Sequence, residues 1–129
     1  MQPTIPYLVF PGQCREAMAF YSELFNAEIT VMQTFGESPM QAPPECGDLI
    51  FNSELKVGEL VIKASDNLPA YKTIPGNNIS LYITFPDQDS QHTCFDKLAA
   101  EGKVLFPINS GFGMIRDKYE IQWMLVFKG

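Results

Sequence analysis

Two stretches of the sequence match each other: residues 7–13 read YLVFPGQ and residues 82–88 read YITFPDQ. Tyr, Phe, Pro and Gln coincide when residue 7 is placed on residue 82, and Phe20 then falls on Phe95. Further on, residues 47–52 match residues 111–116 at a smaller offset, which indicates a longer loop in the first half. The repeat predicts a pseudo-symmetric fold of two similar units, each too small to bury a core alone. Such folds favour a ligand site where the halves meet.

Composition limits what kind of protein this is. At 129 residues and 46% hydrophobic content, the chain is predicted to form a single domain, residues 1–129, and not to be disordered. A net charge of −6 disfavours a nucleic-acid partner, which needs a basic face. No apolar run is long enough to span a membrane, and the N-terminus does not resemble a signal peptide. Three cysteines without a C-x-x-C pair fit reduced thiols and a cytoplasmic location.

Hydrophobic periodicity predicts the same order of elements in each half: strand, helix and three strands, an α+β fold. The first unit is expected at residues 1–66, the connector at 67–78 and the second unit at 79–129. Helices are expected at residues 13–26 and 87–101, with Asp87 as N-cap and Gly102 as a left-handed stop. Residues 36–48 hold three prolines and two glycines and predict a long loop, either a mobile lid or a dimer arm.

A tandem of such units resembles the vicinal oxygen chelate (VOC) superfamily, which includes glyoxalase I, extradiol dioxygenases and the fosfomycin- and bleomycin-resistance proteins. The similarity covers essentially the whole chain and points to the PhnB-like branch. It is carried by residues 6–8, 16–17, 20–21, 24–25, 27–28, 53–55, 64–66 and 112–114, and by the closing residues 122–124 (QWM). The resemblance implies sheets curled around a concave cleft. This branch has been labelled methyltransferase-like, but the sequence contains no glycine-rich loop of the kind that binds a methyl donor.

In enzymes of this superfamily a divalent metal is held by His, Glu or Gln at four positions. The resemblance places these positions at Ile5, Leu60, Ser80 and Met124, none of which is a usual ligand for such an ion. No metal and no cofactor are therefore expected. A metal held by other residues, such as Glu54 or Glu59, stays open as an alternative. The single histidine, His92, is expected on a helix surface.

If the four positions that the resemblance gives, Met124 among them, mark the cleft face, alternation along the strands adds Tyr7, Tyr82, Gln122 and Ile62. The repeat alignment adds Asn52 and Arg116 to the predicted cleft. The repeat pairs Asn52 with Arg116, and Arg116 is the natural anchor for an anionic or carbonyl-bearing ligand. Arg116 is equally well explained as a solvated charge at a turn, and the tyrosines as ordinary strand aromatics.

The cysteines are weak candidates for nucleophiles. Cys14 and Cys94 lie on the apolar stripes of the two helices and are expected in the core. Cys46 lies in the long loop and is a candidate for an exposed thiol, although no basic neighbour is visible to lower its pKa.

Three functions remain open from the sequence. The preferred hypothesis is a homodimer whose apolar and aromatic cleft binds a small organic molecule without the metal. The second is a lyase-, isomerase- or dioxygenase-like enzyme with a non-standard site, in which Arg116, Asn52, Gln122 and a tyrosine polarise a carbonyl or enolate. The third is an interaction module whose cleft is filled by its own side chains.

Overall fold

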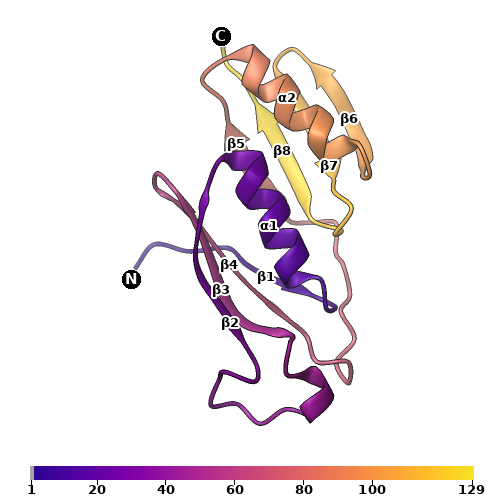
Figure 1. The fold of residues 1–129 in the computed structure, drawn as a ribbon. Coiled ribbons are helices and arrows are strands. Elements are labelled where there is room, and N and C mark those ends of the chain that lie inside the picture. Colours follow the sequence, from indigo (N-terminus) through magenta and orange to yellow (C-terminus); the bar gives the residue numbers. More distant parts are fainter. Residues whose placement is uncertain (1) are drawn as a thin grey trace. The chain divides into compact units, whose positions relative to one another are not determined.

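The computed structural model describes residues 2–129 and divides the chain into two compact units. The first ends at Thr73 and the second runs from Ile74 to Gly129. In both units a strand and a helix are followed by three further strands (Figure 1).

The first unit contains one four-stranded mixed sheet. Its elements are β1 (Tyr7–Phe10), α1 (Cys14–Phe25), β2 (Glu28–Thr34), the 3₁₀ helix η1 (Pro44–Cys46), β3 (Ile50–Val57) and β4 (Leu60–Asp66). The strand order is β1-β4-β3-β2, with β1 parallel to β4 and the other pairs antiparallel. The loop between β2 and β3, which carries η1, extends beyond one end of this sheet (Figure 1).

The second unit repeats this topology. Its elements are β5 (Leu81–Thr84), α2 (Gln88–Ala99), β6 (Lys103–Asn109), β7 (Phe112–Arg116) and β8 (Gln122–Val126). The order is β5-β8-β7-β6, with β5 parallel to β8. The α+β class and the strand–helix–three-strand order predicted from periodicity are confirmed.

A helix covers one face of each sheet (Figure 1). The helix α1 buries a stripe formed by Cys14, Ala17, Met18 and Tyr21. Beneath it the strands bury Ser53, Leu55, Ile62 and Ala64. Since strand side chains alternate between faces, the residues between these positions lie on the opposite face, which we call the helix-free face.

The second helix packs on its sheet in the same way. The helix α2 buries Gln91, Cys94, Phe95 and Leu98, and the strands bury Ile115, Trp123 and Leu125. At Gly113 a Cβ atom would lie 2.7 Å from the Phe95 ring, so the absence of a side chain lets the helix approach β7. Trp123, predicted to pack under a helix, is fully buried.

The helix ends follow from local hydrogen bonds, with one correction to the sequence analysis. Asp87 is the N-cap of α2, because its Oδ1 accepts the Ser90 N–H at 2.7 Å. Gly102 is not in the left-handed region, so the predicted stop is wrong. Glycine is needed there for another reason, since a Cβ atom would lie 2.6 Å from the Arg116 carbonyl oxygen and 2.7 Å from that of Leu98.

A buried aspartate organises the backbone of each unit. The two Asp66 oxygens accept the Cys14 N–H at 2.8 Å and the Ile50 N–H at 2.9 Å, which joins the first turn of α1 to the start of β3. Asp117 Oδ2 accepts the Trp123 indole N–H at 2.8 Å, while its Oδ1 accepts N–H groups of the β7–β8 turn. These carboxylates satisfy donors that would otherwise be buried without partners.

The helices α1 and α2 are each 12 residues long, and no helix in the described part of the chain has the length and apolar character needed to cross a membrane.

We expect Asp66→Asn to destabilise the protein by about 1–3 kcal/mol. An amide has only one acceptor oxygen, so either the Cys14 or the Ile50 N–H would face an NH₂ group instead. Urea unfolding measures this loss. Asp48→Asn, an exposed position near the same end of β3, is the control and should change the free energy of unfolding little. Equal effects of the two substitutions would contradict the role given to Asp66.

Candidate functional site

The helix-free face of the second sheet carries a continuous apolar row. Strand register places one residue from each strand side by side: Phe106, Met114, Met124 and Tyr82. Tyr82 and Phe106, at the two ends, are 55% and 57% exposed, and the methionines between them are half-buried. Strands lie about 4.8 Å apart, so the row is roughly 14 Å long. We call these four residues the apolar row.

The adjacent position along the strands carries polar side chains. Register places Lys103 beside Arg116 and Arg116 beside Gln122, and Ser80 lies just before β5. The Arg116 Nη2 donates to Gln122 Oε1 at 2.5 Å, and Gln122 Nε2 donates to Ser80 Oγ at 3.1 Å. We call Lys103, Arg116, Gln122 and Ser80 the polar row. An apolar surface thus lies directly beside a line of connected hydrogen-bonding groups.

Arg116 is held more firmly than a solvated turn charge would be. Its side chain is 18% exposed, and a second nitrogen lies 3.5 Å from Glu120 Oε2, on a carboxylate that is itself 57% exposed. The long distance and exposure make the Glu120 contact weak. The guanidinium therefore retains N–H groups that can reach another acceptor, in surroundings that are partly shielded from water.

The corresponding face of the first sheet has a different chemistry. Its equivalent row runs Val31, Glu54, Lys63 and Tyr7. The Lys63 Nζ lies 3.8 Å from Glu54 Oε1, and Thr30 Oγ1 donates to Glu54 Oε2 at 2.6 Å. The Tyr7 O–H donates a hydrogen bond to Ser65 Oγ at 2.8 Å. Where the second sheet presents two methionines, the first presents a carboxylate and an ammonium group.

The structure distributes the predicted site residues over both sheets. Arg116 and Gln122 are in direct contact, and Tyr82 and Met124 are register neighbours on the same face of the second sheet. Tyr7 and Asn52 belong to the helix-free face of the first sheet, on strands that β4 separates.

The predicted pairing of Asn52 with Arg116 is wrong. Arg116 pairs with Gln122 one position before the β7–β8 turn, and the residue that holds this place in the first sheet is Lys56, opposite Val61. The sequence match fails because β3 and β4 are joined by the short turn at Gly58, whereas β7 and β8 are joined by residues 117–121.

Two further residues expected on the cleft face lie on the other side of their sheet. Ile62 is fully buried opposite Leu55, under α1, and Leu60 alternates with it on the same side. The first-sheet counterpart of Met124 is therefore Lys63 rather than Leu60, since each lies opposite the equivalent tyrosine.

Sequence reasoning missed the β6 contribution to this face. Lys103 and Phe106 both lie there, although their spacing breaks strict alternation, because the register shifts between Val104 and Phe106. A bulge of this kind leaves no clear signal in the sequence. Met114 could have been assigned to this face from the sequence, since it alternates with Ile115 on a predicted strand.

The metal-ligand positions give no donor set in this structure. Ile5, Leu60, Ser80 and Met124 supply one hydroxyl and one thioether, and within residues 2–129 no three His, Cys, Asp or Glu side chains come together in a way that would hold a metal ion. Glu54 is engaged by Lys63 and Thr30, and Glu59 is exposed at a turn. His92 is exposed on α2, as expected.

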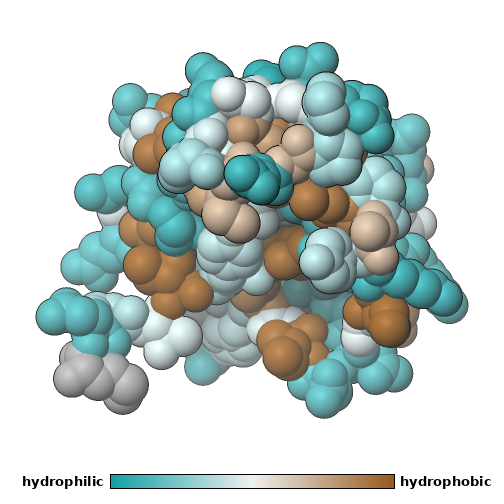
Figure 2. Space-filling view, turned by 90° about the horizontal axis from the view of Figure 1, so that it is seen from below, coloured by the Kyte–Doolittle hydropathy of each residue, from teal (hydrophilic) through white to brown (hydrophobic). Residues whose placement is uncertain are grey.

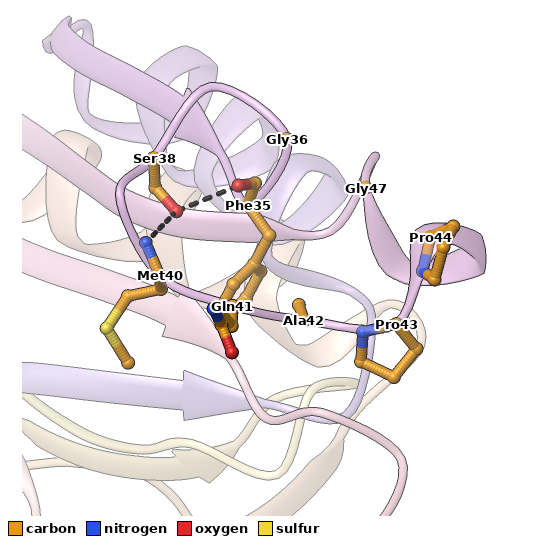
Figure 3. A pocket seen from close by; sticks show the side chains of 9 residues that line it. All are labelled: Phe35, Gly36, Ser38, Met40, Gln41, Ala42, Pro43, Pro44 and Gly47. Atoms are coloured by element: carbon orange, nitrogen blue, oxygen red, sulfur yellow. Dashed lines mark hydrogen bonds between the residues drawn. The ribbon is translucent and has the colours of Figure 1, made fainter.

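The long loop after β2 forms an open hollow of about 430 Å³ (Figure 3). Ser38 Oγ donates to the Phe35 carbonyl oxygen and accepts the Met40 N–H, which fixes one wall. The residues that line it are Phe35, Gly36, Ser38, Met40, Gln41, Ala42, Pro43, Pro44 and Gly47, none of which is charged. The hollow is therefore large enough for a small molecule but has no charged group in its lining to anchor a ligand.

The base of this loop is pinned, which corrects one expectation. The Gly36 N–H donates to the Gly47 carbonyl oxygen at 3.0 Å, and Phe35 N–H to that of Leu49 at 2.9 Å. Cys46 is only 4% exposed, so it is not the accessible thiol that its loop position allowed. Whether the exposed tip moves as a lid or serves as a dimer arm stays a prediction.

Apolar side chains also reach the surface elsewhere. Figure 2 shows them interspersed with polar residues on the face that it draws. Near the boundary of the two units, Tyr71, Ile74 and Ile79 are all highly exposed.

Comparison with known proteins gives a consistent result. A family model described as 3-demethylubiquinone-9 3-methyltransferase matches residues 2–126. Protein YjdN of Escherichia coli (strain K12) is 28% identical, over 95% of this chain and 93% of its own length. Protein PA1353 from Pseudomonas aeruginosa is 31% identical with a TM-score of 0.89, covering 99% of this chain and 98% of its own.

Two further structures extend the similarity. The PhnB protein from Bacillus cereus is 27% identical with a TM-score of 0.79, covering 98% of this chain and all of its own. The fosfomycin resistance protein FosX from Listeria monocytogenes has a TM-score of 0.68 at 9% identity, covering 99% of this chain and 92% of its own. The FosX similarity concerns the fold alone.

Two of the cysteines should be unreactive even in alkaline solution. Desolvation raises the pKa of the Cys14 thiol to about 11, in spite of the Ser53 hydroxyl, and raises that of Cys94 to about 12. Mass-resolved labelling with iodoacetamide at pH 7 and pH 9 should modify Cys46 first, through opening of its loop, and leave the other two slow at both pH values. Because their folded pKa values exceed the ordinary value of 9.0, the stability they contribute is present below pH 9 and is lost as the pH rises towards 11–12. Rapid labelling of Cys94 in native protein at pH 9 would contradict the prediction that this thiol is unreactive.

Proposed function

Because the chain belongs to the 3-demethylubiquinone-9 3-methyltransferase family, a PhnB-like branch of the VOC superfamily, we propose that it binds a small organic molecule on the helix-free face of its second sheet. The observation that carries this proposal is the direct neighbourhood of the apolar row and the polar row on that face. Ligand sites combine an apolar surface with a few placed polar groups in this way.

The apolar row is suited to the body of the ligand. An exposed tyrosine and phenylalanine end a row of two half-buried methionines, and burying such side chains against a ligand is favourable. Methionine side chains are flexible and polarisable, so the row can adapt to flat or branched molecules.

The polar row is suited to one end of the ligand. Arg116 is held by Gln122 and is largely shielded from water, so it would meet an anionic or carbonyl group without losing much side-chain freedom. A charge-assisted hydrogen bond in such a place contributes about 1.5–3 kcal/mol.

The proposed activity is binding rather than methyl transfer. The family name refers to a methyl transfer, and that reaction needs a bound methyl donor beside the acceptor. The two rows supply an apolar surface and hydrogen-bond donors, which hold a molecule in place. Sequestration of a small molecule is therefore the function that the two rows support.

We also propose a cytoplasmic location. The three cysteines are buried and free, which agrees with a reducing compartment.

We also propose that the protein is a homodimer. The two outer strands of each sheet pair with a neighbour on one side only. They are β1 and β2 in the first sheet and β5 and β6 in the second. The exposed apolar residues Tyr71, Ile74 and Ile79 would gain from being covered by a second copy.

Arg116→Ala should weaken binding of an aryl carboxylate about ten- to a hundredfold, because 1.4 kcal/mol corresponds to a factor of ten. Biphenyl-4-carboxylate is a suitable probe, and isothermal titration calorimetry measures its Kd. Gln122 also loses a partner, so a stability loss of about 1 kcal/mol is expected and the titration should be done far below the melting temperature. The matched control is Lys56→Ala, the equivalent position of the first sheet, which should leave the Kd unchanged. If Arg116→Ala binds the probe as tightly as the parent, Arg116 is not its anchor.

Multi-angle light scattering during size-exclusion chromatography, at micromolar protein concentration, should give the mass of a dimer. Replacing Ile74 and Ile79 together with serine should shift the equilibrium towards monomer if this surface is covered by the partner. A parent protein that elutes with the mass of one chain would rule out the dimer.

A further inference from the structure

We infer that the polar row selects ligands that present a hydrogen-bond acceptor, a carboxylate, enolate or carbonyl oxygen, and that Gln122 sets this selectivity by making the Ser80 hydroxyl a donor. The inference rests on the proposed function, since it describes the polar end of the same site. It assigns roles to Gln122 and Ser80 that follow from the direction of the hydrogen bonds.

The direction of these hydrogen bonds is set by Arg116. A guanidinium has only donors, so the atom of Gln122 that faces Arg116 Nη2 must be the amide oxygen. The amide nitrogen then points the other way, towards Ser80. The orientation of this amide is thus fixed by a neighbour that can only donate hydrogen bonds.

Gln122 Nε2 lies 3.1 Å from Ser80 Oγ and 3.4 Å from the carbonyl oxygen of Asn77, so both hydrogens are directed to acceptors. Gln122 is only 5% exposed, which keeps water from replacing these partners. The chain of donors therefore runs from Arg116 through Gln122 to Ser80 without a reversal.

At Ser80 the chain ends in a hydroxyl hydrogen that can be donated to a ligand or to water. Its oxygen accepts from Gln122, and no acceptor within residues 2–129 is found for its own hydrogen. A hydroxyl that accepts a hydrogen bond becomes a better donor, particularly when the chain begins at a cation. Ser80 is half-buried and precedes Tyr82 of the apolar row by two residues, on the same face.

Electrostatics favour the same kind of ligand. Lys103 and Arg116 are cross-strand neighbours on this face, so a cationic donor group would be repelled. Glu120 opposes this by its weak contact with Arg116, and a ligand carboxylate would compete with it. The ligand class is therefore an apolar body that ends in an acceptor oxygen.

The test compares two probes of the same shape with opposite hydrogen-bonding groups, biphenyl-4-carboxylate and biphenyl-4-carboxamidine. Protein labelled with ¹³C at the methionine methyl groups reports directly on the apolar row, through Met114 and Met124. We expect the carboxylate to shift these two resonances and to bind at least tenfold more tightly than the amidine.

Gln122→Glu tests the direction of the chain. A carboxylate would accept from both Arg116 and the Ser80 hydroxyl, so Ser80 would no longer donate to a ligand. The preference for the biphenyl carboxylate over the amidine should fall at least tenfold. Ser80→Ala removes the donor with little risk to folding and should weaken carboxylate binding three- to tenfold. Thr84→Ala, at the end of β5 and on the same face as Tyr82, is the control and should change neither affinity.

The outcomes separate the inference from the proposed function. If both probes shift Met114 and Met124 with similar affinity, the face binds ligands but the selectivity is refuted. If neither probe shifts these resonances, the proposed function fails, and the inference falls with it. An unchanged probe preference in Ser80→Ala, and in Gln122→Glu with a native-like spectrum, would also overturn the role of the chain of donors.

Discussion

Each sheet of this protein is covered by one helix on one face only, and most of its other features depend on that constraint. Strand side chains alternate, so covering one face decides at every position whether a residue packs under the helix or lies on the helix-free face. Ile115, Trp123 and Leu125 enter the core, while Met114, Arg116 and Met124 lie on the helix-free face. The core and the candidate site are therefore interleaved along the same strands.

The two units share a topology but differ on their helix-free faces. Met114 and Met124 stand where the first sheet has Glu54 and Lys63, whereas the residues under the helices are mainly apolar in both. The repeat has kept what the fold requires and changed what it does not. Such divergence on an otherwise equivalent scaffold is how function is placed on a fold without altering it.

The order of elements could be predicted from the sequence because it depends on short-range patterns. Periodicity identified both helices, and Asp87 marked the start of one of them. The pairing register of the strands could not be predicted in the same way. It depends on turn lengths and on bulges, which are visible only in the hydrogen bonds between the strands. This is why Asn52 was paired with Arg116, and why Lys103 and Phe106 were missed.

The candidate site shows the same division. The resemblance placed Met124 on the cleft face and alternation added Tyr82 and Gln122, and the structure has all three on the helix-free face of the second sheet. The hydrogen-bond chain that joins Gln122 to Ser80 is a tertiary contact between β8 and the segment before β5, and nothing in the sequence indicates its direction. Burial of Cys46 likewise depends on how its loop folds back, which composition does not determine.

The position of the only tryptophan has a practical consequence. Trp123 is fully buried in the second unit, and its indole N–H is bound to Asp117, while the first unit contains tyrosines but no tryptophan. Fluorescence excited at the red edge of the indole band will therefore report on the second unit alone, and the far-ultraviolet signal will report on both. The protein carries its own optical label for one half of its repeat, so the cooperativity between the halves can be measured without adding a dye.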